Sequence, residues 1–263
     1  MNMKVSEEGS ADPRPLHQRI AADLREEILS GELLPGSTLP STQQLRERFG
    51  VANATIQKAL QVLKDEGMLL GRAGANVSVR EHRQRTIQPA ITIVPAPPGQ
   101  PYVWLTKVPR PGESGAIELL EVAEVQPPGE VAGALGLPDG GTAVRRSQLL
   151  RINGEPAELV TSYYPIELAR GTAMMENRKI KGGTPRLLKD MGYPPRKSVD
   201  LVSARVPTQE QYRRLELPSD LPVLRTFRVV YSDDERPIEA TVMVKASHLY
   251  ELQYELTGET ESA

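Results

Sequence analysis

The chain has 263 residues, of which 25% are charged and 39% apolar, so we expect a globular protein of one large domain or two ordinary ones. It contains no cysteine, which excludes disulfides, thiol catalysis and cysteine-based zinc sites. The net charge of −2 is uneven, because the stretch from Arg14 to Arg85 has eleven Lys and Arg against eight Asp and Glu, which leaves −5 for the rest. A basic excess at one end is typical of a module that faces nucleic acid.

The sequence does not support a metalloprotein, a membrane protein or a secreted protein. The three histidines, His17, His82 and His248, are scattered without metal-ligand spacing, so we expect no metal and no cofactor. No apolar run approaches the roughly 18 residues that a membrane span requires. The N-terminus is polar and acidic, unlike a secretory signal, so we expect residues 1–12 to form a disordered tail of a cytoplasmic protein.

The apolar pattern predicts three helices near the N-terminus. In the first, apolar residues recur every four positions up to Gly31. The second begins with a capping box of Ser41 and Gln44 and ends at Gly50, and the third ends at Gly67. The apolar positions that define these helices are Leu16, Ile20, Leu24, Ile28, Leu45, Phe49, Ile56, Ala59, Leu60 and Leu63.

A short hairpin is predicted directly after the third helix. The stretch MLLGRAGANVSV has two apolar runs around a tip that holds Arg72 and Gly74. Three helices followed by a hairpin predict a winged helix-turn-helix over residues 13–80. A small helical subdomain that packs on a protein partner is the alternative.

Residues 81–102 are expected to be an extended linker, because EHRQRTIQ is polar and PAPPGQP cannot continue a helix or a central strand. From residue 103 to residue 256 the pattern changes to strand-like runs broken by turns, with a short tail over 257–263. The runs are AIELLEVAEV, AVRRSQLLRI, AELVTSYY, SVDLVSARV, PVLRTFRVVY and IEATVMV, and the helical candidates are GEVAGAL, TPRLLKDM and TQEQYRRL. This order predicts a mainly antiparallel α+β domain.

The second domain contains an internal repeat. Residues 127–154, shifted by 80, fall on 207–234, so that the turn Asn153-Gly154 meets Asp233-Asp234. With one added residue, Pro156-Ala157-Glu158 then meets Pro237-Ile238-Glu239. The repeat predicts two similar halves related by a pseudo-twofold axis, with chance similarity between two hairpins as the alternative.

The stretch from Leu16 to Val79 closely resembles the DNA-binding domain of GntR-family transcription regulators. LPSTQQLRERFGVANATIQKALQVLKDEG and the later GRAGANV carry the resemblance. It implies a dimer on double-stranded DNA, with the third helix in the major groove and the wing tip in the neighbouring minor groove. The predicted DNA-binding residues are Ser41, Thr42, Gln43, Asn53, Ala54, Thr55, Gln57, Lys58, Gln61, Arg72 and Gly74. For each side chain taken alone, an ordinary solvated surface is the alternative.

The third helix has amides where relatives commonly have arginines. Asn53, Gln57 and Gln61 share one face of this helix, and Gln43 lies on the preceding helix. Arginine favours guanine, whereas Asn and Gln match the N6 and N7 edge of adenine. The sequence therefore predicts operator half-sites weighted toward A·T pairs.

The second domain resembles the UTRA ligand-binding domain of HutC-like GntR regulators. PPGEVAGALGLPDGGTAVRR, NGEPAELVTSYYP and PTQEQYRRLELPSDLPVLRTFRVVYSDDERPIEATVMV carry this resemblance. It implies a chorismate-lyase-like fold, in which an antiparallel sheet has helices on one face and a small-molecule pocket, and dimerisation through this domain.

The resemblance also implies positions for a small-molecule effector on the strands. It points to Arg145, Arg146, Gln148, Ser162, Tyr163 and Glu239, and the repeat adds Glu158, Arg225 and Arg228. Sugar-phosphate-binding relatives have alternating arginines where this chain has Gln148 and Leu150, which puts a phosphorylated ligand in doubt. Glu239 is the strongest candidate, because a partly buried carboxylate needs a partner.

These features together predict a dimeric repressor that a small molecule releases from a pseudo-palindromic operator, on the nucleoid of a bacterial cytoplasm. A constitutive DNA-binding dimer is one alternative, and a lyase-like enzyme is the other. We find no nucleophile–base pair in the sequence, so we expect no catalytic residue.

Overall fold

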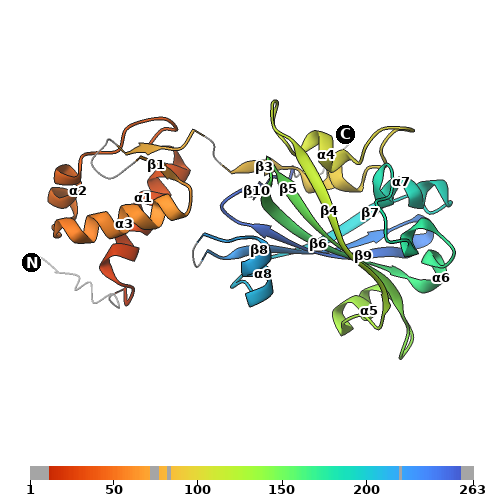
Figure 1. The fold of residues 1–263 in the computed structure, drawn as a ribbon. Helices are drawn as coiled ribbons and strands as arrows, with labels where there is room; N and C mark the ends of the chain where they lie inside the picture. Colours follow the sequence, from red (N-terminus) through yellow and green to blue (C-terminus); the bar gives the residue numbers. More distant parts are fainter. Residues whose placement is uncertain (1–11, 72–76, 82–83, 219–220, 256–263) are drawn as a thin grey trace, which may run out of the picture. The chain divides into compact units, whose positions relative to one another are not determined.

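The structure, a computed structural model, describes residues 12–71, 77–81, 84–218 and 221–255 (Figure 1). The chain divides into two compact units, Met1–Arg83 and Gln84–Ala263. Within the described residues, no helix has the length and apolar character needed to cross a membrane.

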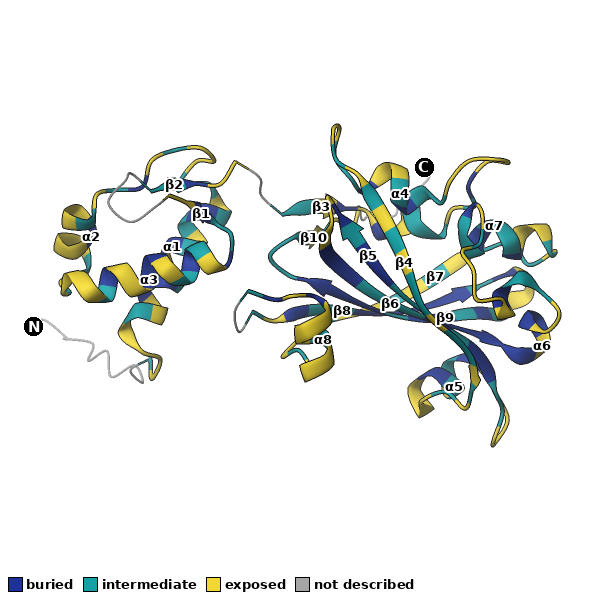
Figure 2. Ribbon diagram, viewed as in Figure 1, coloured by how far each residue is buried: buried dark blue, intermediate teal, exposed yellow. Residues whose placement is uncertain are grey.

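The first unit contains the three predicted helices and the predicted hairpin. The helices are α1 (Leu16–Ser30), α2 (Thr42–Phe49) and α3 (Asn53–Asp65). Strands β1 (Leu69–Leu70) and β2 (Ser78–Val79) pair antiparallel. The helices bury one face each in a common core that contains Leu24, Leu45 and Leu63 (Figure 2).

Local capping and one ion pair fix the geometry of this unit. The Gln44 amide N–H donates to Ser41 Oγ over 3.2 Å, and the Ser41 N–H donates to Gln44 Oε1 over 2.7 Å, which confirms the capping box. Arg25 on α1 pairs with the buried Glu66 just after α3, with Nη2 and Oε1 2.6 Å apart. The pair holds the C-terminal end of α3 against α1.

The second unit is built on a six-stranded antiparallel sheet with the order β4-β5-β6-β9-β8-β7. The predicted strand-like runs are all present. They form β4 (Gly115–Val125), β5 (Ala143–Ile152), β6 (Glu155–Pro165), β7 (Lys197–Arg205), β8 (Val223–Tyr231) and β9 (Pro237–Ala246).

The sheet order confirms the internal repeat. Strand β4, helix α5 (Gly129–Leu135), β5 and β6 form one half, and β7, helix α8 (Gln209–Arg214), β8 and β9 form the other. The two halves run inward from opposite edges and meet where β6 pairs with β9. Equivalent strands of the two halves therefore lie at equal distances from the centre of the sheet. A pseudo-twofold axis between β6 and β9 produces this arrangement.

Helices lie on both faces of the sheet, so the expectation of helices on one face is wrong (Figure 1). Helices α5 and α8 lie on one side, where side chains such as Leu135 and Leu215 pack on the strands. The other side is covered by α4 (Val103–Lys107), α6 (Ile166–Ala169), α7 (Gly183–Asp190) and the 3-10 helices η1 (Pro89–Ile93) and η2 (Ala173–Met175). A third 3-10 turn, η3 (Asp233–Glu235), connects β8 to β9.

The segment expected to be a linker is largely part of the second unit. Strand β3 (Arg85–Ile87) pairs in parallel with β10 (Tyr250–Leu252), and Arg85 Nη2 lies 2.7 Å from Glu113 Oε1. Ile87 and Tyr250 are buried in one cluster with Trp104. The linker prediction is therefore wrong for residues 85–93, because their partners lie far along the chain and leave no local sequence signal.

Candidate functional site

The predicted DNA-binding side chains gather on the outer surfaces of α2 and α3. On α3, Ile56 and Leu63 face the core, whereas Asn53, Gln57 and Gln61 are exposed. Ser41, Gln43, Ala54 and Lys58 are also exposed, and Thr42 and Thr55 are partly buried. Arg72 and Gly74 lie outside the described residues.

A side-chain hydrogen bond joins the two helices within this surface. Gln57 Nε2 donates to Thr42 Oγ1 over 3.4 Å, so α2 and α3 present their polar groups side by side. Gln43 donates to Glu47 over 3.0 Å, and Gln61 donates to Asp65 over 2.6 Å. Among the described residues, the Asn53 amide has no such bond. It occupies the first turn of α3, the part of a recognition helix that reaches base edges.

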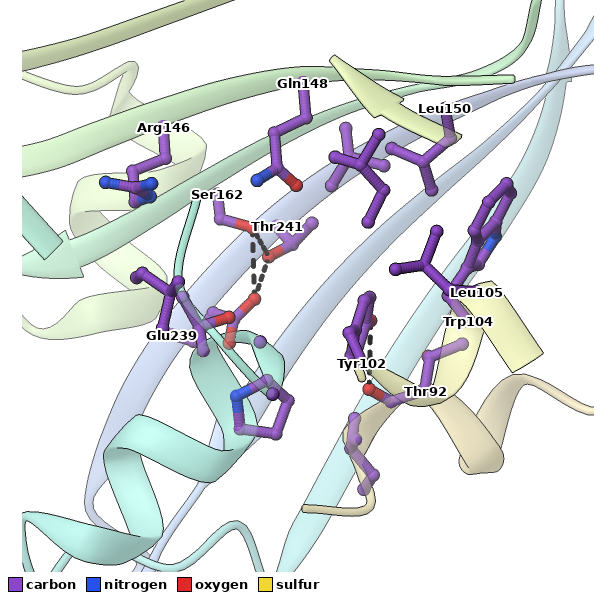
Figure 3. A pocket seen from close by; sticks show the side chains of 18 of the residues that line it. Thr92, Tyr102, Trp104, Leu105, Arg146, Gln148, Leu150, Ser162, Glu239 and Thr241 are labelled. Atoms are coloured by element: carbon purple, nitrogen blue, oxygen red, sulfur yellow. Dashed lines mark hydrogen bonds between the residues drawn. The ribbon is translucent and has the colours of Figure 1, made fainter. Parts of the chain in front are cut away.

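The second unit contains a cavity of about 440 Å³ on the face of the sheet that carries η1, α4 and α7 (Figure 3). This volume is within the range of small-molecule sites. Six of the nine predicted effector residues line it, namely Arg146, Gln148, Glu158, Ser162, Arg228 and Glu239.

The other three predicted effector residues face away from the cavity. Arg145 pairs with Glu121 at 2.6 Å, Arg225 pairs with Glu130 on α5 at 2.5 Å, and Tyr163 is buried against α5. Successive side chains of a strand point to opposite faces of the sheet. Residues next to cavity-lining positions therefore lie on the face opposite the cavity. Their prediction as cavity contacts is therefore wrong.

Glu239 lies in the cavity wall, and no cation hydrogen-bonds to it within the part of the chain that the structure describes. Its Oε1 accepts from Thr241 Oγ1 at 2.6 Å and from Ser162 Oγ at 3.1 Å (Figure 3). Burial raises the pKa of the Glu239 carboxyl above its usual value, and its hydroxyl partners and the nearby charge of Arg228 offset only part of the rise.

Glu158, the repeat counterpart of Glu239, has a different environment. It is buried and pairs with the buried Lys245 of β9, with Oε1 and Nζ 2.9 Å apart. One glutamate is therefore neutralised by a lysine, whereas the other depends on hydroxyl groups.

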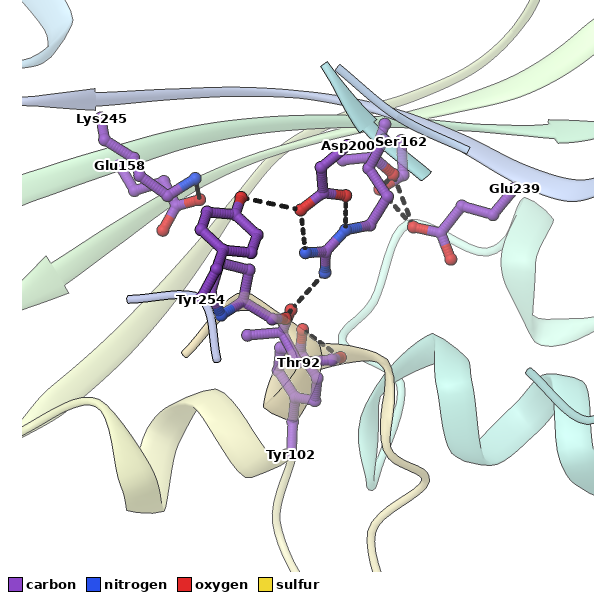
Figure 4. A network of polar contacts seen from close by, with 11 residues as sticks. Thr92, Tyr102, Glu158, Ser162, Asp200, Glu239, Lys245 and Tyr254 are labelled. Atoms are coloured by element: carbon purple, nitrogen blue, oxygen red, sulfur yellow. Dashed lines mark hydrogen bonds and ion pairs between the residues drawn. The ribbon is translucent and has the colours of Figure 1, made fainter. Parts of the chain in front are cut away.

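Three separate segments meet around the cavity at Thr92, Asp200 and Tyr254 (Figure 4), and Arg228 hydrogen-bonds to the first two of these residues. Its Nε and Nη2 donate to the carboxylate of Asp200 on β7 over 2.6 and 2.7 Å. Its Nη1 donates to Thr92 Oγ1 on η1 over 2.6 Å, and Tyr254 donates to Asp200 over 3.4 Å. This network ties the segment that follows the first unit to strands β8 and β7 of the sheet.

Arg146 is a buried guanidinium that is held by backbone oxygens. Nη1 donates to Met174 O and Glu176 O over 2.7 and 3.0 Å, and Nη2 donates to Arg178 O over 2.7 Å. Its Nε is buried without a partner among the described residues. Burial lowers the pKa of Arg146, because no carboxylate hydrogen-bonds to it to compensate for lost hydration.

Several cavity residues were missed by the sequence analysis. Tyr102, Trp104, Thr184 and Thr241 line the cavity, and Tyr102 donates to Thr92 O over 3.1 Å. The Gly-Gly-Thr run before the helical pattern was the available signal. Gly183 has φ +80°, and a Cβ there would lie 2.6 Å from Tyr102 Cδ2, so the ring packs directly on the glycine.

Two family models match the chain. The UTRA domain matches residues 112–251, more than half of the sequence, and the gntR family of bacterial regulatory proteins matches residues 16–79. A solved structure of a putative GntR-family transcriptional regulator is 25% identical, covers 94% of this chain and 99% of its own, and has a TM-score of 0.60. The structure of PhnF from Mycobacterium smegmatis, 18% identical, covers 91% of this chain and all of its own with a TM-score of 0.57, which shows the shared fold.

Curated relatives are similar along nearly the whole chain. The transcriptional regulator GgaR of Escherichia coli is 25% identical over 92% of this chain and 91% of its own. The probable transcriptional regulator PhnF of Escherichia coli is 27% identical over 91% and 94%. MngR of Escherichia coli, a mannosyl-D-glycerate transport/metabolism system repressor, is 39% identical over 27% of this chain and 29% of its own. The chain therefore belongs to the GntR family of DNA-binding bacterial regulators, with the HutC-like UTRA architecture, and is a transcription regulator and not an enzyme.

Proposed function

We propose that this protein is a homodimeric repressor that leaves its operator when a small molecule occupies the cavity of the second unit. One observation carries the proposal: the segment that directly follows the DNA-binding unit forms part of the cavity wall. Thr92 and Tyr102 both line the cavity, and Thr92 is hydrogen-bonded to Arg228, which lines it as well. A bound effector therefore touches the segment through which the two units are connected.

The response requires that the effector bind one arrangement of this segment more tightly than the other. Thr92 accepts from Arg228 and donates to Pro89 O over 2.9 Å, so its position depends on both the cavity and η1. A ligand that competes for Arg228 or displaces Tyr102 changes the position of η1 relative to β3. The cavity supports this effector-responsive function over constitutive binding, for which a filled core would suffice.

Repression is supported by the relative MngR, which is named a repressor. Homodimerisation through the second unit is supported by the outer edge of its sheet. Val199 and Leu201 on the edge strand β7 are 43% and 60% exposed. The opposite edge strand, β4, instead carries exposed glutamates such as Glu118 and Glu121, which discourage strand pairing.

The DNA surface supports operator half-sites weighted toward A·T pairs. Asn53 and Gln57 are exposed on α3 and suit the edge of adenine, and the exposed Ala54 suits the thymine methyl group. A binding selection from random duplexes should enrich A·T pairs under α3. Invariant G·C pairs at these positions would contradict the proposal.

Replacement of a single amide tests the reading of bases. Gln57→Ala should weaken operator binding by about 1–3 kcal/mol and relax selection at one position. Gln18→Ala removes an exposed amide from α1 and is the matched control. A uniform loss on all sequences would instead assign Gln57 to backbone contacts.

Two Thr→Val substitutions, one in the cavity wall and one outside it, test the effector response. A thermal-shift screen of sugars, amino acids and amino-sugar metabolites should find a compound that raises the melting temperature and lowers operator affinity. Thr92→Val should keep DNA binding but reduce the release of DNA at saturating concentrations of this compound. Thr106→Val, an exposed position on α4, is the control. Stabilising compounds that all leave operator affinity unchanged would contradict the proposed release.

A further inference from the structure

A second, much smaller void lies in the interior of the second unit, next to the cavity of about 440 Å³. Its volume is about 20 Å³, which is enough for one water molecule, since one water needs roughly 10–15 Å³. The two share part of their lining. The lining residues that belong to the small void alone are Ile87 of β3, Pro89 of η1, Thr226 of β8, Lys245 of β9 and Leu252 of β10.

Two buried polar atoms next to this void have no partner in the part of the chain that the structure describes. They are Trp104 Nε1 and Thr226 Oγ1. Trp104 is 2% exposed and Thr226 is 1% exposed, so bulk water does not reach them. A buried N–H or hydroxyl group without a hydrogen bond costs free energy, because it has lost its bonds to water. Both residues line the small void, so one molecule there can satisfy both groups.

The buried ion pair of Glu158 and Lys245 lines the same void. Glu158 Oε1 and Lys245 Nζ lie 2.9 Å apart, and neither side chain has a further ion pair or hydrogen bond within the described residues. An ammonium group has three donors, and a carboxylate has about four acceptor positions, so this one contact leaves most of them unused. A buried ion pair is favourable only when additional hydrogen bonds satisfy the remaining donors and acceptors.

The groups around the void select a neutral molecule that both donates and accepts hydrogen bonds. A cation is disfavoured because the Trp104 indole N–H is a donor only and Lys245 is positively charged. An anion is disfavoured by the carboxylate of Glu158, and a hydrocarbon group would leave the indole N–H unpaired. Water accepts from the indole and the ammonium group and donates to the threonine hydroxyl and the carboxylate.

We infer that the small void holds one ordered water, which bridges Trp104 to Thr226 and to the Glu158–Lys245 pair. The water joins helix α4, which contains Trp104, to strands β6, β8 and β9. It lies beneath Ile87 and Pro89, so it is also part of the contact between the sheet and the segment that follows the first unit. The inference goes beyond the proposed function, because this water is present with or without an effector or an operator.

A crystal structure of the full chain, at a resolution that shows ordered waters, tests the inference directly. One water oxygen should lie roughly 2.7–3.2 Å from both Trp104 Nε1 and Thr226 Oγ1. Thr226→Ser retains the hydroxyl group and should retain this water. No water at this position in the unsubstituted protein, or a water that contacts only one of the two atoms, would overturn the inference.

Thr226→Val gives an independent test in solution, because the two states of the void predict opposite signs. Loss of a water-bound hydroxyl removes a hydrogen bond, so the equilibrium constant for unfolding should rise about fivefold or more. In a dry void, valine would remove an unsatisfied hydroxyl and add apolar surface, so the constant would fall. Urea unfolding followed by the emission of Trp104, the single tryptophan, measures the constant. An unchanged or lower constant would overturn the inference.

Thr161→Val is the matched control. Thr161 lies on β6, is partly exposed, and lines neither the small void nor the larger cavity. Its hydroxyl group is accessible to solvent, so the substitution should change the equilibrium constant for unfolding by less than about twofold. An equal rise for Thr161→Val and Thr226→Val would show that valine is unfavourable in this sheet for another reason and would overturn the assignment of the water.

Amide hydrogen exchange tests whether the water holds the neighbouring segment. Peptides that cover residues 87–94 should exchange about threefold faster or more in Thr226→Val, and should be unchanged in Thr161→Val. Equal rates in the two variants would overturn the role of the water in this contact. These measurements use neither operator nor effector, so a failure of the proposed repressor function leaves this inference intact, and a failure of the inference leaves that function intact.

Discussion

At the scale of single residues, the two repeat-related glutamates show how neighbours decide the behaviour of a carboxylate. Glu158 and Glu239 occupy equivalent positions in the two halves, on strands that pair with each other. Glu158 has Lys245 as its partner, whereas Glu239 has the hydroxyls of Ser162 and Thr241. Removal of the charge is therefore expected to have opposite effects on stability at the two positions.

Glu239→Gln should stabilise the protein at neutral pH. The folded-state pKa of Glu239 is raised by burial, so its ionisation costs stability as the pH rises from the unfolded value of about 4.3 through the folded value. The gain in melting temperature should thus be present at pH 8 and vanish toward pH 4. Thermal unfolding across this range measures it, and a gain that grows in acid would contradict the assignment.

Glu158→Gln, the matched substitution, should instead destabilise the protein. It leaves Lys245 buried without its counter-charge, which costs about 3–5 kcal/mol. Denaturant unfolding of both variants gives the comparison. Equal effects at the two positions would show that the lysine does not distinguish them.

Gly183 is a position where both the backbone and the neighbouring ring require glycine. Gly183→Ala should cost about 1 kcal/mol for its positive φ and about 1–3 kcal/mol more for the clash with Tyr102. Gly171 has φ +73° with no atom within 4 Å of an added Cβ, so Gly171→Ala isolates the backbone cost. Denaturant unfolding should give the larger loss at Gly183, with altered Trp104 emission only there. Equal losses would contradict the packing of Tyr102 on Gly183.

At the scale of elements, the alternation of strand side chains decides which predicted residues can meet a ligand. Strands β5 and β8 place Arg146, Gln148 and Arg228 toward the cavity, whereas Arg145 pairs with Glu121 on β4 and Arg225 pairs with Glu130 on α5. The alternation of side chains along each strand can be predicted from the sequence. The sequence does not indicate which face of the strand lines the cavity. Both faces are covered by helices, so apolar residues occur on both and the pattern does not separate them.

The edge strand β7 is the element for which a partner is predicted. Leu201→Lys should weaken dimerisation about a hundredfold, because an isologous interface loses the side chain twice, at about 1.5 kcal/mol or more each. Sedimentation velocity measures the effect. Leu34→Lys changes a leucine in the first unit that is 63% exposed and should leave the dimer intact. A dimer unaffected by Leu201→Lys would place the interface elsewhere.

At the scale of the whole molecule, the boundary between the units lies earlier than the change in sequence pattern suggests. Contacts within the second unit begin at Gln84, whose side chain donates to Ser247 O over 2.6 Å. The β3–β10 pairing and the bond from Arg228 to Thr92 then hold residues 85–93 in place. The DNA-binding unit is therefore followed at once by a segment that belongs to the effector unit.

Two fragments test this boundary. Residues 84–263 should unfold cooperatively and keep the Trp104 emission of the full chain. Residues 103–263 lack Ile87, the Arg85–Glu113 pair and Thr92, and should be less stable by about 3 kcal/mol or more. Calorimetry and tryptophan fluorescence give the comparison, and equal stability of the two would contradict the boundary.

The sequence by itself determined the features that depend on local pattern. Helix α3, with its polar face from Asn53 to Gln61, followed from the spacing of apolar residues, and the two halves of the sheet followed from the repeated stretches. These elements are encoded by residues a few positions apart or by direct similarity, so they can be read without a structure.

Only the tertiary structure decided which distant residues share a site. Thr92 and Arg228 are separated by 136 positions yet form a hydrogen bond, and Trp104 and Leu150 pack in one buried cluster. It also decided that Glu239 has hydroxyls for partners while Glu158 has a lysine. The physical reason is that burial and pairing arise from strand order and from the face that each residue presents, and neither is fixed by the residues next to it in the chain.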